Sequence, residues 1–222
     1  MIRRLSGFFT FLLSFMLLAS YASANSVDLL NFNYLKNGQQ VATFYDGGSG
    51  NPNIPNYGVT FSSNFYGLRS EFQGGAGAFS PDPTSTPVIF ILGTTGSLVT
   101  GSMNAANGFS SGINFFYTAA FQETATVWSG ANGTGTVLDT ITLSANDVNC
   151  TGVGYCNWTD VGLSFSGTAH SVTFSGPANG IGISDITLGQ STSAVPEPSS
   201  IYLLATGIAG ICGQGIRRFL RG

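Results

Sequence analysis

The fold is decided by two stretches near the end of the chain, VGLSFSGTAHSVTF at residues 161–174 and IGISDITL at residues 181–188. In the first, large apolar residues recur at alternate positions, which is the period of a β-strand with one buried face. In the second, the alternation changes phase in its middle, at Ser184 and Asp185. The change of phase predicts a bulge, or a strand that crosses between two sheets.

Upstream of these stretches, shorter apolar segments alternate with turn-forming clusters. Strands are predicted at residues 27–32, 41–45, 57–62, 88–92, 112–118, 123–129 and 137–143. The clusters at 46–50 and 130–135 are rich in Gly, Ser and Asn, which favour tight turns. Many short strands joined by polar turns predict an all-β fold, an antiparallel β-sandwich of jelly-roll type.

The composition suits such a fold and excludes one class of ligand. The chain has 31 glycines and 8% charged residues, and 13% of it is aromatic, so it can form many turns and still bury a core. Between residues 25 and 194, only Lys36 and Arg69 are basic against nine acidic residues, a net charge of −7. This charge repels phosphate backbones, so nucleic acid is not an expected partner.

The N-terminus has the three parts of a secretory signal peptide. Arg3 and Arg4 form the basic start, residues 8–18 form a short apolar segment, and residues 22–24 are an Ala-Ser-Ala cleavage site. The mature chain is therefore expected to begin at Asn25. A retained membrane anchor is the alternative, but the apolar run is short for a membrane span.

The C-terminus carries a motif, an apolar run and a basic end. The motif is Val195-Pro196-Glu197-Pro198-Ser199, and its two prolines keep the segment extended and accessible. Residues 201–216 are predicted to form a transmembrane helix about 24 Å long, slightly shorter than the bilayer core. The basic residues that follow, Arg217, Arg218 and Arg221, should remain in the cytoplasm and leave the domain outside.

This tail resembles the PEP-CTERM sorting signal, in which a Pro-Glu-Pro motif, a short membrane helix and an Arg-rich end follow one another. The resemblance implies that an exosortase, a membrane cysteine transpeptidase, is a partner and processes the chain at the motif. It also implies a membrane-anchored intermediate, and then the cell surface or extracellular matrix of a Gram-negative bacterium that produces exopolysaccharide or biofilm. A plain C-terminal membrane anchor is the alternative.

The expected organisation has five parts: residues 1–24 as signal peptide, 25–190 as β-sandwich ectodomain, 191–200 as linker with the Pro-Glu-Pro motif, 201–216 as transmembrane helix and 217–222 as cytoplasmic tail. The ectodomain is similar to a layout common among PEP-CTERM proteins, and domains of this layout resemble lectin-type jelly rolls. Its opening strand has Asn31 and Asn33 where an acidic residue is usual. This difference weakens a structural calcium site between the first and last strands, and neither a metal nor a cofactor is predicted.

One motif points toward catalysis. Residues 108–112 match the Gly-x-Ser-x-Gly elbow of hydrolases, with Ser110 in the centre, and His170, the single histidine, follows later. The elbow requires a strand that turns into a helix, whereas a predicted strand follows here, so a turn is the better interpretation. One histidine without a Cys or His cluster does not make a zinc centre. The protein is predicted not to be an enzyme, with a secreted hydrolase as an alternative.

The two cysteines of the middle domain enclose a short loop. Export places Cys150 and Cys156 in an oxidising compartment, so a disulfide is predicted between them, with a redox or metal role as the alternative. The closed loop is short, so the disulfide is expected to contribute only about 2 kcal/mol. Cys212 lies in the predicted membrane segment and is expected to pack there or to carry an acyl group.

The candidate ligand-binding residues are Tyr155, Trp158 and Asp160. Aromatic faces offer large rigid surfaces for sugar rings, and the carboxylate can accept from a sugar hydroxyl; Trp128 is a further stacking candidate. The alternative for the aromatic residues is core packing. The predicted function is an exported surface or matrix protein that binds neutral exopolysaccharide weakly, and the alternative is a structural matrix protein with no ligand site.

Overall fold

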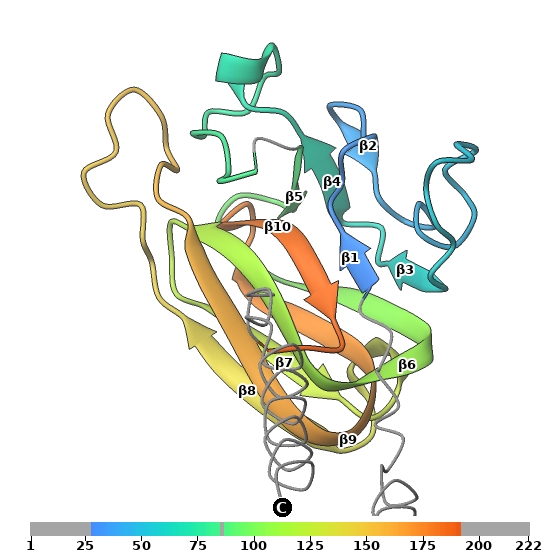
Figure 1. The fold of residues 1–222 in the computed structure, drawn as a ribbon. Helices are drawn as coiled ribbons and strands as arrows, with labels where there is room; N and C mark the ends of the chain where they lie inside the picture. The colour runs from blue at the N-terminus through green and yellow to red at the C-terminus, as the bar shows by residue number, and fades with distance from the viewer. Residues whose placement is uncertain (1–27, 85–86, 192–222) are drawn as a thin grey trace, which may run out of the picture.

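The computed structural model describes residues 28–84 and 87–191. The predicted signal peptide, the motif at 195–199, the membrane helix and the Arg-rich end all lie outside the described residues. Ten strands and two short 3₁₀ helices, η1 and η2, form the described part (Figure 1). They are β1 Asp28–Leu30, β2 Gln39–Gln40, β3 Val59–Phe61, β4 Phe65–Leu68, η1 Glu71–Gln73, β5 Val88–Ile91, β6 Leu98–Ala119, β7 Glu123–Trp128, η2 Ala131–Gly133, β8 Val137–Leu143, β9 Thr159–Pro177 and β10 Ile181–Leu188.

All of the named strands pair antiparallel, and two long strands organise the sheet. The strand order is β2-β4-β5-β10-β6-β9-β7-β8, with β1 on β10 and β3 on β6. β6 and β9 pair along most of their length, from Leu98↔Pro177 to Tyr117↔Thr159. Their ladder shifts register between Asn104 and Phe109, where the long strands bend (Figure 1) because a bulge bends the strand that carries it.

The inner faces of the strands enclose the main core. Phe65 of β4 lies against Phe174 of β9, with ring centroids 6.3 Å apart, and against Phe61 of β3 at 5.2 Å. A Cβ on Gly101 of β6 would lie 2.4 Å from the Phe65 ring, so the absence of a side chain there allows the layers to approach. The sheet therefore folds over onto itself, and the prediction of an all-β antiparallel sandwich is confirmed.

The predicted phase break in the last strand is a bulge. The ladder between β10 and β6 shifts register between Ser184 and Thr187, and Asp185 has a positive φ of 48°. On its other edge β10 pairs first with β5 and then with β1, where Asp28 faces Leu188. The two ends of the described chain therefore lie on neighbouring strands.

The prediction of a strand at 41–45 is wrong. Val41, Phe44 and Tyr45 are buried, but the Phe44 amide donates to the Val41 carbonyl at 2.8 Å, and Ala42 has φ of 37°. The segment therefore turns rather than extends. A turn of three residues places its first and fourth side chains on one side, so apolar residues can be buried there without a strand.

Three strand segments were not predicted, and the shortest of them is the two-residue β2. The first half of β6, residues 98–107, points Gly101, Met103 and Ala105 toward the core, and two of these are too small to give an apolar signal. β4 was missed as well, because its inner positions are Phe65 and Gly67. A Cβ on Gly67 would lie 3.0 Å from the Leu35 side chain, so the small residue at this position serves packing.

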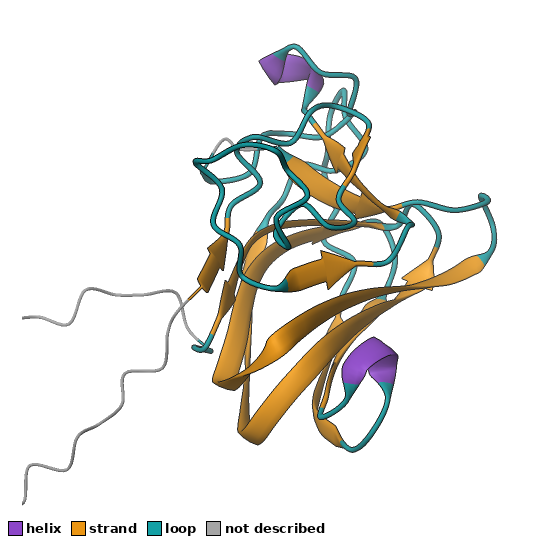
Figure 2. Cartoon of the chain, turned by 90° about the vertical axis from the view of Figure 1, so that its right-hand side faces the viewer, coloured by secondary structure: helices purple, strands orange, loops and turns teal. Residues whose placement is uncertain are grey.

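The outer face of the sheet differs between its two halves. Over β5 and β10, outward-facing Val88 and Phe90 pack with Phe79 in a second apolar cluster, so this half is covered. Over β7 and β8, the outward positions carry threonines that are half-buried or exposed. Figure 2 shows η1 and η2 at opposite ends of the molecule, with most of the strands between them. No helix of residues 28–84 and 87–191 is long and apolar enough to cross a membrane.

Candidate functional site

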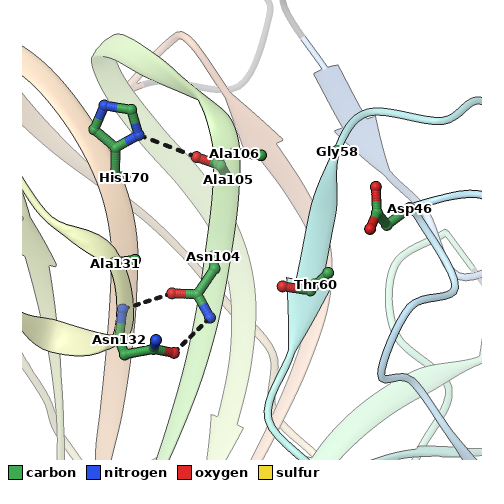
Figure 3. Close-up of a pocket in the computed structure, with 9 residues that line it drawn as sticks. All are labelled: Asp46, Gly58, Thr60, Asn104, Ala105, Ala106, Ala131, Asn132 and His170. Atoms are coloured by element: carbon green, nitrogen blue, oxygen red, sulfur yellow. Dashed lines mark hydrogen bonds between the residues drawn. The ribbon is translucent and has the colours of Figure 1, made fainter.

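An open polar groove lies where the first half of β6 meets β3, β9 and the η2 turn (Figure 3). Its volume is about 490 Å³, and its lining is formed by Asp46, Gly58, Thr60, Asn104, Ala105, Ala106, Ala131, Asn132 and His170. Strands β3, β6 and β9 form the floor of the groove, while turns supply Asp46 and Asn132. The groove therefore combines a rigid floor with polar groups from loops, the usual location of binding residues.

Two asparagines form the best-ordered wall of the groove. The Asn104 Nδ2 donates to Asn132 Oδ1 at 2.9 Å, and the Asn132 backbone amide donates to Asn104 Oδ1 at 2.6 Å. Asn132 has a left-handed backbone, with φ of 54°, which asparagine tolerates better than most residues. The Gly133 amide donates to Ser171 Oγ at 3.0 Å, so η2 is fastened to β9 on the other side.

The other polar groups that line the groove are the Asp46 carboxylate, the Thr60 hydroxyl and the His170 imidazole. His170 Nδ1 lies 3.3 Å from the Ala105 carbonyl oxygen, so the tautomer with its hydrogen on Nδ1 donates to that carbonyl and leaves Nε2 as an acceptor. Thr60 on β3 and Asp46 stand across from Asn104 (Figure 3). Amides, hydroxyl and carboxylate together can both donate to and accept from the hydroxyl groups of a ligand.

The hydrolase elbow is not formed. Residues 108–112 lie inside β6, which continues as a strand to Ala119, and the positive φ values at Gly108 and Ser111 belong to bulges in that strand. Ser110 faces Thr168 in the β6–β9 ladder, and the groove that contains His170 is lined by other residues than Ser110. The geometry required of a nucleophile elbow is therefore missing at this motif.

The structure places Tyr155 and Trp158 on the covered half of the sheet. The Tyr155 hydroxyl donates to the Asn179 carbonyl, and its ring meets that of Phe90 edge-on at 5.3 Å. The Trp158 Nε1 donates to the Ser80 carbonyl at 3.0 Å, and its ring lies 6.4 Å from that of Phe79. Both side chains are half-buried, so packing uses one part of each ring, and their role in stacking stays a prediction.

Asp160 and Trp128 form their hydrogen bonds with other parts of the domain than Tyr155 and Trp158 do. Asp160 is exposed and accepts from Asn114 Nδ2 at 2.6 Å. Trp128 lies on the outer face of β7, half-buried, and its Nε1 donates to Thr173 Oγ1 at 2.9 Å. Each predicted aromatic candidate thus has its polar atom bonded within the domain.

The predicted disulfide is confirmed. Cys150 and Cys156 are bonded, with Cα atoms 5.4 Å apart, and the loop they close carries Tyr155 onto Phe90. Asn157, next to the disulfide, donates through Nδ2 to the carbonyls of Asn146 and Val148 at 2.8 and 2.9 Å. The loop is therefore held in place by both the disulfide and an amide clamp.

The most acidic buried site is formed by Asp82 and Asp185. The Thr84 hydroxyl lies 2.6 Å from Asp82 Oδ2 and 2.5 Å from Asp185 Oδ2, and Ser184 Oγ lies 2.7 Å from Asp82 Oδ2. Burial, with the nearby charge of Asp82, raises the pKa of the Asp185 carboxyl. No group of three or more His, Cys, Asp or Glu residues suited to a metal ion occurs within 28–84 and 87–191.

Of the groove residues, only His170 stands out in the sequence, and there it points to a hydrolase rather than to a binding site. Asp46 and Asn132 lie in the two clusters that were interpreted only as turns, and Asn104 lies in the unpredicted half of β6. The one signal at Asp46 and Asn132 is an Asp or Asn beside glycine, which turn formation already explains. Only the pairing of β6 with β3 and β9 brings them together.

Comparison with known proteins identifies no family: no family model matches the chain, and no curated protein matches it. Among solved structures, it is similar to a family 6 carbohydrate-binding module from Clostridium stercorarium in complex with cellobiose, at 11% identity and a TM-score of 0.36, over 74% of this chain and 94% of the other. A family 29 carbohydrate-binding module gives 14% and 0.38, over 74% and 91%. A cleaved adhesin domain of Lys-gingipain from Porphyromonas gingivalis gives 11% and 0.41, over 75% and 99%. At these scores the similarities carry no inference about this chain.

Proposed function

We propose that this protein is exported, sorted to the cell surface or extracellular matrix through its PEP-CTERM-type tail, and binds neutral carbohydrate weakly through the polar groove. The observation that carries the binding proposal is the locked pair of Asn104 and Asn132, whose amides are held in an open groove of about 490 Å³. The jelly-roll type of the sandwich belongs to this proposal as well.

The polar groups of the groove suit a ligand rich in hydroxyl groups. The second Nδ2 hydrogen of Asn104, the Nδ2 group of Asn132, the Thr60 hydroxyl and the Asp46 carboxylate are distributed around one space. The Asn pair is ordered before a ligand arrives, so binding would cost little conformational entropy.

Charge determines which carbohydrates fit. Asp46 is an acidic residue of the lining, and the domain from 25 to 194 has two basic residues against nine acidic ones. An anionic polysaccharide would be repelled, since long-range attraction needs opposite charge. The ligand class is therefore neutral glycan.

Weak affinity follows from the shape of the groove. It is open, and none of its lining residues is Phe, Tyr or Trp, so a sugar would lose little apolar surface to it. We expect dissociation constants near the millimolar range, which correspond to about −4 kcal/mol.

Binding is tested with the full chain, purified in a polyoxyethylene detergent that has no sugar headgroup. The probes are dextran, cellulose, mannan, galactan and xylan, with polygalacturonate as an anionic control. Asn132→Gly removes the amide and keeps a residue that tolerates the left-handed backbone, so it should weaken binding to a neutral glycan about tenfold.

Asn149→Gly is the matched control, because Asn149 is an exposed asparagine with φ of 60° outside the groove. It should leave binding unchanged. If no neutral glycan binds at millimolar concentration, the binding proposal is wrong and a structural matrix role becomes the better account.

Sorting is tested by mass spectrometry of the surface protein from the host. The mature chain should begin at Asn25 and lack Arg217 and Arg218 after processing near Pro196-Glu197-Pro198. The confirmed disulfide supports an oxidising compartment for the domain. An intact C-terminus in cells with an active exosortase would contradict processing and would leave anchoring in place.

A further inference from the structure

The bare half of the sheet presents hydroxyl groups in register across four strands. Strand pairing aligns Thr100 of β6, Ser175 of β9, Thr124 of β7 and Thr142 of β8 in one row. The next row contains Ser102, Thr173, Thr126 and Thr140 in the same strand order. All eight residues are Ser or Thr, so two consecutive rows of the sheet carry hydroxyls and no charge. We call this surface the hydroxyl face.

The hydroxyl face points away from the core. The residues between its members, such as Gly101, Ala125 and Phe174, are buried, and successive side chains of a strand point to opposite sides. Thr100, Thr140 and Thr142 are exposed, while Thr173 is mostly covered because it accepts from the Trp128 indole. Most of the face is therefore accessible from outside.

Hydrogen bonds between neighbouring hydroxyls hold part of the face in place. Thr100 Oγ1 and Ser175 Oγ are 2.9 Å apart, and Thr140 Oγ1 donates to Thr126 Oγ1 at 3.3 Å. Threonine is stiff at χ1, so little side-chain entropy is lost when such a surface binds. Each hydroxyl keeps a further acceptor site for a ligand.

A second hollow lies at the far end of the face. It has a volume of about 520 Å³, and its lining includes Leu98, Thr100, Gln122, Thr124, Ser175 and Pro177. Leu98 is 81% exposed, an unusual state for a large apolar side chain, and it can contact the apolar face of a sugar ring. The hollow thus contains the first hydroxyl row and an apolar contact beside it.

The groove and the second hollow are joined along β6. Ala105 lines the groove and Val99 lines the hollow. Five residues of β6 lie between them, so the two are about 20 Å apart along the strand. Asn104, Ser102 and Thr100 point outward along this path. We propose that the path binds an extended, uncharged polysaccharide chain, laid along β6 over several sugar rings, rather than a single terminal sugar. This inference rests on the proposed function, because one end of the path is the same groove.

The test compares oligosaccharide lengths on the full chain in the same sugar-free detergent. The probes are the dimers and hexamers of β-1,4-linked glucose, β-1,4-linked mannose, β-1,4-linked xylose and α-1,6-linked glucose, titrated by calorimetry. At least one hexamer should bind more than tenfold tighter than its dimer. A site that holds only two sugar rings would give a smaller gain, because a hexamer offers such a site only a few alternative positions. Thr100→Val with Thr124→Val should remove that gain, because valine keeps the β-branched shape and loses the hydroxyl.

Thr168→Val is the matched control, since Thr168 is an exposed threonine on β9 outside the hydroxyl face, and it should keep the length dependence. If dimers and hexamers bind within a few-fold of each other, or if the double variant keeps the gain, the inference is wrong and the proposed function stands. If neither length of any probe binds at millimolar concentration while polysaccharides do not bind either, the proposed function has failed as well.

Discussion

On both β5 and β7, some side chains point away from the main core. Those of β5 are apolar and buried, whereas those of β7 are mostly threonines. Val88 and Phe90 of β5 are buried beneath Phe79, Tyr155 and Trp158, in the second apolar cluster. On β7, the outward positions Thr124 and Thr126 have no such cover and stay half-buried. One half of the sheet is closed by loops, and the other half meets solvent.

The type of residue at an outward position indicates whether a loop covers that part of the sheet. An apolar outward residue needs a covering segment, because burial of apolar surface is what stabilises the loop against the sheet. A threonine keeps the β-branched shape that strands favour and can remain wet. The covered half should therefore control stability, and the hydroxyl face should contribute little to it.

The largest expected effect comes from emptying the covered half. Phe90→Ala should lower the free energy of unfolding by about 4 kcal/mol, the usual cost of a deleted phenylalanine in a core. Thr126→Ala on the hydroxyl face is the control and should cost less than about 1 kcal/mol. Urea unfolding of both variants measures the contrast, and equal costs would show that the two halves are equally important to stability.

The next effect concerns the carboxyl group of Glu123, which lies close to Gly176 and Gly180 where β9 is joined to β10. Glu123 is 2% exposed, and its Oε1 has no hydrogen-bond partner among the described residues. A Cβ on Gly176 or Gly180 would lie 1.8 or 2.4 Å from its carboxylate oxygens, so the two glycines leave the space that it fills. Burial raises the pKa of Glu123 from 4.5 to about 7, because a carboxylate inside the protein loses hydration.

The sign of the pH dependence follows from this raised pKa. The stabilisation is fully present below pH 4.5, declines as the unfolded chain ionises, and is lost once pH rises above about 7. The total change is on the order of 3 kcal/mol. Glu123→Gln should match the parent protein at pH 4 and exceed its stability at pH 8. Parallel stability curves from pH 4 to pH 8 would mean that Glu123 does not titrate in this way.

A smaller effect is expected from the loop that closes the covered half. Cys150→Ser with Cys156→Ser should cost about 2 kcal/mol, because the disulfide closes a short loop and restricts the unfolded chain little. Thermal unfolding without reductant measures this cost. Cys212→Ser, outside the disulfide, is the control for the substitution itself, and a loss of the same size in that variant would disprove the assignment to the disulfide.

The smallest expected effect isolates one hydrogen bond of the cover. Tyr155→Phe keeps the ring against Phe90 and removes the hydroxyl that donates to the Asn179 carbonyl. The expected loss is about 1 kcal/mol, measured by urea unfolding. If Tyr155→Phe also weakens glycan binding with stability unchanged, Tyr155 belongs to a ligand site, as its sequence context predicted.

Most of the strands that could be predicted have large side chains on the inner face. β8 and β10 are examples, and the bulge at Asp185 is visible as a change of phase. β7 was predicted although Glu123 and Ala125 fill two of its three inner positions. The first half of β6 escaped prediction because Gly101 and Ala105 fill its inner positions. Gly101 is needed where the Phe65 ring crosses from the opposite layer, a requirement that no local pattern reveals.

The sequence by itself determined the all-β class, the disulfide and the low charge of the domain, because these depend on composition, period and spacing along the chain. Only the tertiary structure decided which polar residues meet. Asp46, Asn104, Asn132 and His170 come from four distant segments, and the register of β6 with β3 and β9 places them around one groove. Register is a property of paired strands, set by how the whole core packs, so a single chain segment cannot specify it.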